Sequence, residues 1–332
     1  MFTHLFAFGY VAVWVTGLRE AEQPPLQVTA KVLVNDPLYK KQLPYLQAIG
    51  VPSAWERLVS TRVRREKVTV AVIDSGVQSD HPDLVANVIK GYNVIDHNGD
   101  THDRNGHGTA MAGVLGATLN NSIGLAGVAD LVNIMPIFYG EPPSFASMTG
   151  AIDYVIRQKH VKIILMASSA NASPGTFTAK VKEADAAGIL TIVTAGNEGK
   201  NITTDRRFPC AFTTQLKGML CVTATGVSNM RLDADSNFAN YLDIAAPGTD
   251  IVSTVMNGGY SYVGGTSAAA AIVAGVAAML YSLAPTLMPA DAKKILKDTA
   301  KNGVKDSSGR RVFPFGRIDA DKAVAKLLPR KL

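Results

Sequence analysis

The feature that most constrains the fold is a series of short apolar runs that alternate with helical patterns. Segment 68–73 is almost entirely apolar and rich in valine, as expected of a parallel strand buried on both faces. Four similar runs lie at 133–137, 161–166, 189–195 and 220–224. Helical patterns lie between or after them, at 107–119, 147–159, 179–187, 267–283 and 289–299. This alternation predicts an α/β fold with a mainly parallel sheet and helices on both faces.

The bulk composition is that of a globular chain. Its 332 residues are 47% apolar and 18% charged, which is enough to bury one large core. The net charge is +6, but the basic residues are scattered and form no stripe interleaved with aromatic residues. We therefore expect a basic, soluble surface and no nucleic-acid partner.

The N-terminal segment 1–21 has the form of a signal peptide. Its apolar run, 5–17, is too short to cross a bilayer as a helix, and small residues at Gly17 and Ala21 suit cleavage. No Lys or Arg precedes the run, which departs from the usual pattern. We expect a secreted protein without a stable membrane span. It would have a short leader or pro-segment remnant at 22–33, one domain at 34–328 and a C-terminal tail at 329–332.

The chain has two cysteines, Cys210 and Cys221. In a secreted protein such a pair can form a disulfide, and only one connectivity exists. The alternative is two buried thiols.

Four polar residues stand where apolar runs or helical patterns begin or end. Asp74 and Asn197 each follow a buried run, while His107 lies between two glycines at the start of a helical pattern. Ser267 follows a Gly-Gly-Thr sequence directly before an apolar helix, where free backbone N–H groups favour negative charge. Taken singly, each has a plain structural explanation as a cap, a turn residue or a satisfied core histidine.

Together, in the order Asp, His, Asn, Ser, these residues resemble the motifs of the subtilisin-like serine peptidases. The resemblance covers about 34–328 and implies a three-layer subtilisin-like fold. It is carried by 73–77, 81–84, 106–109, 194–199, 236–238, 244–248 and 265–267.

The resemblance implies a serine endopeptidase that acts on peptides and proteins as a monomer. Ser267 would attack the peptide carbonyl, His107 would act as general base and then general acid, and Asp74 would orient the imidazole. Asn197 and the backbone N–H of Ser267 would stabilise the oxyanion.

The substrate-binding segments implied by the resemblance are Ala167, Ser168 and Ser169, together with Ala195 and Gly196. The family usually has Ser-Leu-Gly at the first of these, a strand that pairs with the substrate backbone and whose glycine floors the first specificity pocket. Ser169 in place of that glycine should reshape the pocket. A second departure follows the nucleophile, where Ala268 replaces the usual Met.

A calcium loop is also implied. Its oxygen ligands would come from the carboxylates of Asp36 and Asp83, the amide of Asn121, and the carbonyls of Leu119, Ile123 and Leu125. The alternative is an Asx-rich turn without a metal.

Two functions remain open at this point. The first is an active endopeptidase, for which a pro-domain or protein inhibitor is a possible partner. The second is a weak or inactive homologue that binds peptides or proteins, suggested by Ala268 and the altered 167–169 segment. A Rossmann-type nucleotide binder is a poor reading, because no Gly-x-Gly-x-x-Gly motif follows Ile73.

Overall fold

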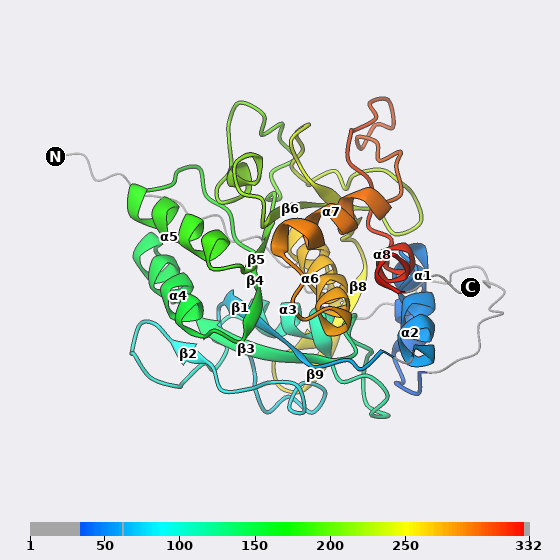
Figure 1. Cartoon of the computed structure of the whole chain (residues 1–332), viewed down its shortest axis with the longest axis horizontal. Coiled ribbons are helices and arrows are strands. Elements are labelled where there is room, and N and C mark those ends of the chain that lie inside the picture. Colours follow the sequence, from blue (N-terminus) through cyan, green and yellow to red (C-terminus); the bar gives the residue numbers. More distant parts are fainter. Residues whose placement is uncertain (1–33, 62, 329–332) are drawn as a thin grey trace.

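The computed structural model describes residues 34–61 and 63–328 (Figure 1). The expected signal peptide at 1–21, the leader at 22–33 and the tail at 329–332 lie outside these residues.

The core of the fold is a parallel sheet of seven strands in the order β2-β3-β1-β4-β5-β6-β7. The five predicted runs form the central strands, which confirms the sheet expected from the sequence. The strands are β1 (Val68–Asp74), β2 (Tyr92–Asn93), β3 (Val132–Phe138), β4 (Val161–Met166), β5 (Leu190–Thr194), β6 (Met219–Thr225) and β7 (Ile244–Pro247). The short edge strands β2 and β7 were not predicted.

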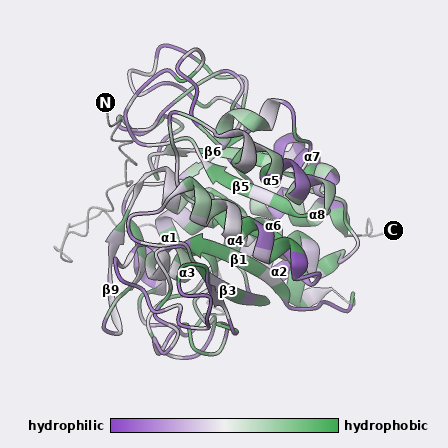
Figure 2. Cartoon of the chain, turned by 90° about the vertical axis from the view of Figure 1, so that its left-hand side faces the viewer, coloured by the Kyte–Doolittle hydropathy of each residue, from purple (hydrophilic) through white to green (hydrophobic). Residues whose placement is uncertain are grey.

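Helices cover both faces of the sheet, as Figure 1 shows. Alternate residues of β1 separate the two layers: Val70 and Val72 belong to one core cluster, and Ala71 and Ile73 belong to the other. One face carries α4 (Phe145–Arg157) and α5 (Gly175–Ala186). The other carries α1 (Tyr39–Ala48), α2 (Val51–Ser60), α3 (His107–Gly116), α6 (Gly265–Leu283), α7 (Pro289–Thr299) and α8 (Ala320–Leu327). Figure 2 shows β1, β3 and β5 of the sheet mostly in the hydrophobic colour, whereas α7 and many loops are more hydrophilic.

Helix α6 runs through the centre of the second layer. Within the described chain it is the one helix long and apolar enough to cross a membrane, but it is completely buried inside the fold. Its run of alanines, 268–271, lets it pack closely against α3 and the sheet. The sequence analysis predicted an apolar helix at 267–283 and no membrane span; this helix has the length and hydropathy of a span but lies inside the fold.

A hairpin of β8 (Ile251–Val255) and β9 (Gly259–Val263) packs against α3. Its turn contains Asn257 and Gly258, both with positive φ. The Ser253 and Thr254 hydroxyls donate to backbone carbonyls of α3 at 2.5 and 2.7 Å.

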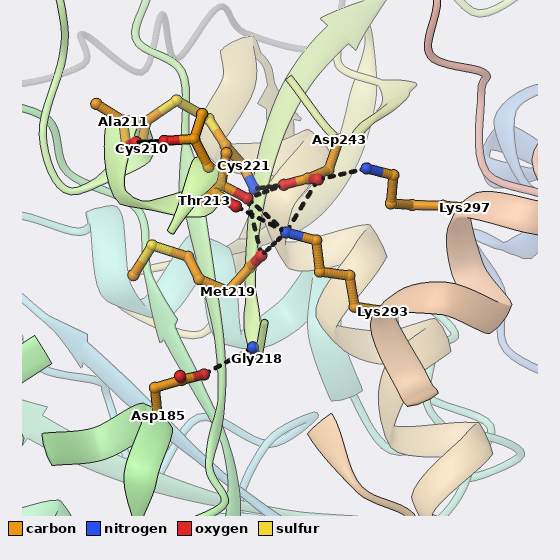
Figure 3. A network of polar contacts seen from close by, with 11 residues as sticks. Asp185, Cys210, Ala211, Thr213, Gly218, Met219, Cys221, Asp243, Lys293 and Lys297 are labelled. Carbon is orange, nitrogen blue, oxygen red and sulfur yellow. Dashed lines mark hydrogen bonds and ion pairs between the residues drawn. A yellow bond between two sulfur atoms is a disulfide. The ribbon is translucent and has the colours of Figure 1, made fainter. Parts of the chain in front are cut away.

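The disulfide between Cys210 and Cys221 joins the 3-10 helix η1 (Cys210–Thr214) to β6, so the alternative of two free thiols was wrong. Figure 3 shows the polar network beside it, centred on the buried carboxylate of Asp243. Asp243 accepts hydrogen bonds from Thr213 and from the Cys221 backbone, and it pairs with Lys293 and Lys297. The segment around η1 is therefore anchored both covalently and by charge.

Candidate active site

Asp74 and His107 form a buried pair at the carboxyl edge of the sheet. Asp74 is the last residue of β1 and His107 is the first residue of α3. The His107 Nδ1 atom lies 2.7 and 2.9 Å from the two carboxylate oxygens of Asp74. This geometry fixes the imidazole so that Nε2 points away from the carboxylate.

The close approach of α3 to β1 requires a glycine after the histidine. A Cβ atom at Gly108 would overlap the carbonyl oxygen of Gly76 and lie 3.1 Å from the Cβ of Asp74. A second glycine, Gly106, precedes the histidine with a φ of 97°, in the region that favours glycine. The flanking glycines therefore allow the pair to form.

Asp103 holds the start of α3 in place, and the sequence analysis did not identify it. This buried carboxylate accepts hydrogen bonds from the backbone N–H groups of Asn105, Gly106 and Thr109 at 2.8–3.0 Å. It also accepts from the hydroxyls of Ser75 and Thr109 at 2.8 and 2.5 Å. The N-cap residue Gly106 has no side chain, so Asp103, three residues earlier, supplies the acceptor for the free N–H groups at the start of α3.

The pKa of His107 is raised above its ordinary value. Burial lowers the pKa, but the charge and hydrogen bond of Asp74 outweigh this effect, and the charges of Asp103 and Glu141 add to the increase. Within the described residues, His107 Nε2 has no hydrogen-bond partner. The ring therefore keeps one buried nitrogen available for a proton.

Ser267 lies in the first turn of α6 and is fully buried. Its hydroxyl donates to the carbonyl of Ala167, which directly follows β4, at 3.3 Å. The structure thus does not place this hydroxyl in a hydrogen bond with His107. Helix α3, which begins with His107, packs against α6, which carries Ser267.

Asn197 is oriented by the residue before the serine. Its Oδ1 atom accepts from the backbone N–H and the hydroxyl of Thr266 at 2.9 and 2.7 Å. The Nδ2 group has no hydrogen-bond partner in the described part of the chain, and it lies so close to Gly265 that no side chain fits there. Thr266, which the sequence analysis did not single out, therefore turns the amide donor toward the start of α6.

The two expected substrate segments lie against each other. Gly196 has a φ of 98°, and a Cβ atom there would lie 3.0 Å from the Ser169 hydroxyl and 2.7 Å from Glu198 Oε2. Ala167 and Ala195 are buried beside the sheet edge. The Ser168 hydroxyl is buried and without a partner among the described residues.

Comparison with known proteins shows the family of this chain. Residues 65–316 match the model of the subtilase family. The chain belongs to the subtilase family. Its relatives include thermitase of Thermoactinomyces vulgaris, which is 29% identical over 87% of this chain and 98% of its own length. The intracellular serine protease of Paenibacillus polymyxa is 36% identical over 72% of each chain.

Solved structures of subtilisin-like proteases have the same fold. A protease from Pseudoalteromonas arctica superposes with a TM-score of 0.75 at 26% identity, covering 89% of this chain and 99% of its own. The chain spans 61% of the length of the thermophilic serine proteinase of Bacillus sp. strain AK1, to which it is 32% identical over 77% of its residues. By family, this subtilase is classed with the subtilisin-like serine-type endopeptidases.

The expected calcium loop of this subtilase brings its two carboxylates close to the same backbone. Asp36 accepts from the backbone N–H groups of Asn120 and Asn121 at 2.9 and 3.0 Å. Asp83 accepts from the Asn121 amide and the Leu125 backbone, both at 2.8 Å. Leu119 and Ile123 lie in the same loop.

The electrostatics of this loop fit a cation. Burial raises the pKa of both Asp36 and Asp83, and the charge of Asp36 raises the pKa of Asp83 further. Neither carboxylate forms an ion pair with a basic side chain of the described chain. The described residues contain no cluster of three His, Cys, Asp or Glu side chains, so a metal here would need carbonyl and amide ligands.

Proposed function

We propose that this subtilase hydrolyses peptide bonds in peptides and proteins, with Asp74, His107 and Ser267 as its catalytic triad. The observation that carries the proposal is the buried Asp74–His107 pair, whose free Nε2 is available to a serine on the adjacent helix. The order and spacing of the motifs in the sequence support the same assignment.

In the first step, the Ser267 hydroxyl gives up its hydrogen bond to the Ala167 carbonyl. Its proton passes to His107 Nε2 as its oxygen bonds to the substrate carbonyl carbon. Asp74 holds the Nδ1 proton and stabilises the imidazolium. His107 then protonates the leaving amine, which breaks the peptide bond and leaves an acyl-enzyme. Water, activated by the same imidazole, releases the acid product.

The negative charge on the substrate oxygen needs donors in a fixed position. Asn197 Nδ2 is such a donor, because Thr266 holds the other end of its amide. The backbone N–H of Ser267, at the start of α6, is the second. Loss of one donor of this kind costs about 2.7–4 kcal/mol of transition-state stabilisation.

A weak or inactive peptide-binding homologue remains the alternative, and one observation favours it. The Ser267 hydroxyl is bonded to Ala167, a residue of the altered substrate segment, and His107 Nε2 has no hydrogen-bond partner within the described part of the chain. If this arrangement persisted with substrate bound, the serine would not be activated.

Labelling with a fluorophosphonate probe separates the two functions. We expect the probe to modify the wild type at neutral pH and to leave Ser267→Ala unmodified. Ser261→Ala serves as a control for an unrelated buried serine and should label normally. A folded wild type that resists the probe would favour the binding-only homologue.

We further propose that residues 34–328 act as one monomeric peptidase domain that binds structural Ca²⁺ at Asp36, Asp83, Asn121, Leu119, Ile123 and Leu125. The ion would neutralise two buried carboxylates and tie the N-terminal segment to the loop. Secretion, directed by a signal peptide at 1–21, is supported by the disulfide, since such bonds persist in oxidising compartments. Relatives named as intracellular serine proteases provide the contrasting case.

A further inference from the structure

A buried arginine lies beside the proposed catalytic centre, and peptide hydrolysis as such gives it no role. The Arg207 side chain is 10% exposed and pairs with Glu198 through Nη2 at 3.2 Å. Its Nε group is buried and has no hydrogen-bond partner among the described residues. A buried cation with an unmet donor is costly unless something binds it.

The side-chain partner of Arg207 and the residue that follows it in the chain both connect to segments of the proposed active site. Its pairing partner, Glu198, directly follows the proposed oxyanion donor Asn197. The next residue, Phe208, exchanges backbone hydrogen bonds of 2.8 and 2.9 Å with Ala170, which directly follows the substrate segment 167–169. The guanidinium therefore pairs with the segment of Asn197, while the backbone next to Arg207 is bonded to the residue that follows segment 167–169.

The backbone of Arg207 is firmly held. Its carbonyl accepts from the Ala211 N–H at 2.8 Å, and Cys210 is joined to β6 by the disulfide. The Asp243 network in Figure 3 fixes the rest of this turn. The arginine thus extends from a rigid base, as a group that selects a ligand should.

The cluster of Arg207, Glu198 and Asn237 has an unused hydrogen-bond donor. Glu198 already uses both oxygens, one for Arg207 and one for the Asn237 amide. The Arg207 Nε group, by contrast, has no hydrogen-bond partner among the described residues. A ligand that completes the cluster must supply acceptors, and a carboxylate does so with charge-assisted hydrogen bonds.

We propose that Arg207 determines specificity and that the enzyme prefers an acidic residue, such as Glu, directly before the cleaved bond. This inference rests on the proposed function, because segments 167–169 and 195–196 hold the substrate only if the chain is such a peptidase, and the first of them would then line the first specificity pocket. The acidic side chain would take the place of the Glu198 carboxylate on the guanidinium, or would bind the guanidinium together with it.

The test compares three fluorogenic peptides that differ only in having Glu, Gln or Lys before the cut. For the wild type we expect kcat/KM with Glu to exceed that with Gln by about tenfold or more, the effect of one hydrogen bond to a charged group. Arg207→Gln should bring the ratio to about one. Glu198→Gln should increase it, because the guanidinium loses a competing carboxylate. The control Arg206→Gln removes the same charge from an exposed neighbour and should keep the wild-type ratio.

A ratio near one in the wild type, or a ratio unchanged by Arg207→Gln and Glu198→Gln, would overturn the inference while leaving the peptidase intact. If the wild type cleaves nothing and resists the fluorophosphonate probe, the proposed function fails instead. In that case the role of Arg207 is tested with the Ser267→Ala variant, by measuring its affinity for labelled peptides that end in Glu or in Gln. Tighter binding of the Glu peptide supports the inference, and equal binding refutes it.

Discussion

At the scale of single residues, the site is a set of buried polar groups that fix one another. Asp103 bonds to no catalytic side chain, yet its charge raises the pKa of His107 and its hydrogen bonds hold the start of α3. It is therefore a positioning residue, and its effect should be visible in the pH dependence of the reaction.

We predict that the acid limb of kcat/KM lies above the ordinary histidine pKa of about 6.5, since His107 must be neutral to act as base and its pKa is raised. Asp103→Asn removes one of the charges that raise it, so the limb should move to lower pH. Activity on the acid side should then increase relative to the plateau. A pH profile of the two proteins measures this.

The matched control for this prediction is Asp100→Asn, which neutralises an exposed carboxylate three residues earlier in the same loop. Its limb should coincide with that of the wild type. A shift of equal size in both variants would mean that overall charge, rather than the position of Asp103, sets the pKa. A limb in Asp103→Asn at or above the wild-type value would contradict the prediction.

At the scale of elements, the sequence was informative where one physical signal dominated. The central strands were predictable because strands buried on both faces read as continuous apolar runs. Helix α1 was missed because Pro44 interrupts its pattern. The β8–β9 hairpin was missed although Asn257-Gly258 is a strong turn signal, because β8 is buried on both faces and shows no alternation of polar and apolar residues.

The contact between α3 and β1 provides a prediction at this scale. Gly108→Ala should push the helix away from Gly76 and break the geometry of the Asp74–His107 pair. We expect a loss of about 100-fold or more in kcat/KM, as displacements near 1 Å produce. Overpacking should also lower the free energy of unfolding by about 1–3 kcal/mol. Peptide hydrolysis and chemical denaturation measure the two effects.

The control is Gly99→Ala, since a Cβ at Gly99 meets no atom within 4 Å and its φ is not in the positive region. It should change neither quantity noticeably. Normal activity in Gly108→Ala would show that α3 can shift without disturbing the pair.

At the scale of the whole molecule, the site assembles from residues far apart in the chain, and this limits what sequence reasoning can find. The motifs identified Asp74, His107, Asn197 and Ser267 as candidates, but no local pattern indicates that Arg207 is buried or that it meets Glu198. Such contacts depend on which segments pack together in space, and the sequence does not specify this. The same limit applies to Asp243, whose lysine partners come from α7.

The loop of Asp36 and Asp83 links the first described residues to the rest of the fold, so its metal should affect global stability. A cation bound only by the native state raises the free energy of unfolding, by about 2.7 kcal/mol at 100 times its Kd. We therefore predict that a chelator lowers the unfolding temperature of the wild type and that added Ca²⁺ restores it. In Asp83→Asn, which removes a buried carboxylate, chelator and Ca²⁺ should have little effect. Asp80→Asn changes an exposed carboxylate nearby and should respond as the wild type does. Identical melting curves of the wild type with and without chelator would exclude a stabilising calcium site, and the two carboxylates would then be held by the backbone N–H groups around them and by the Asn121 amide.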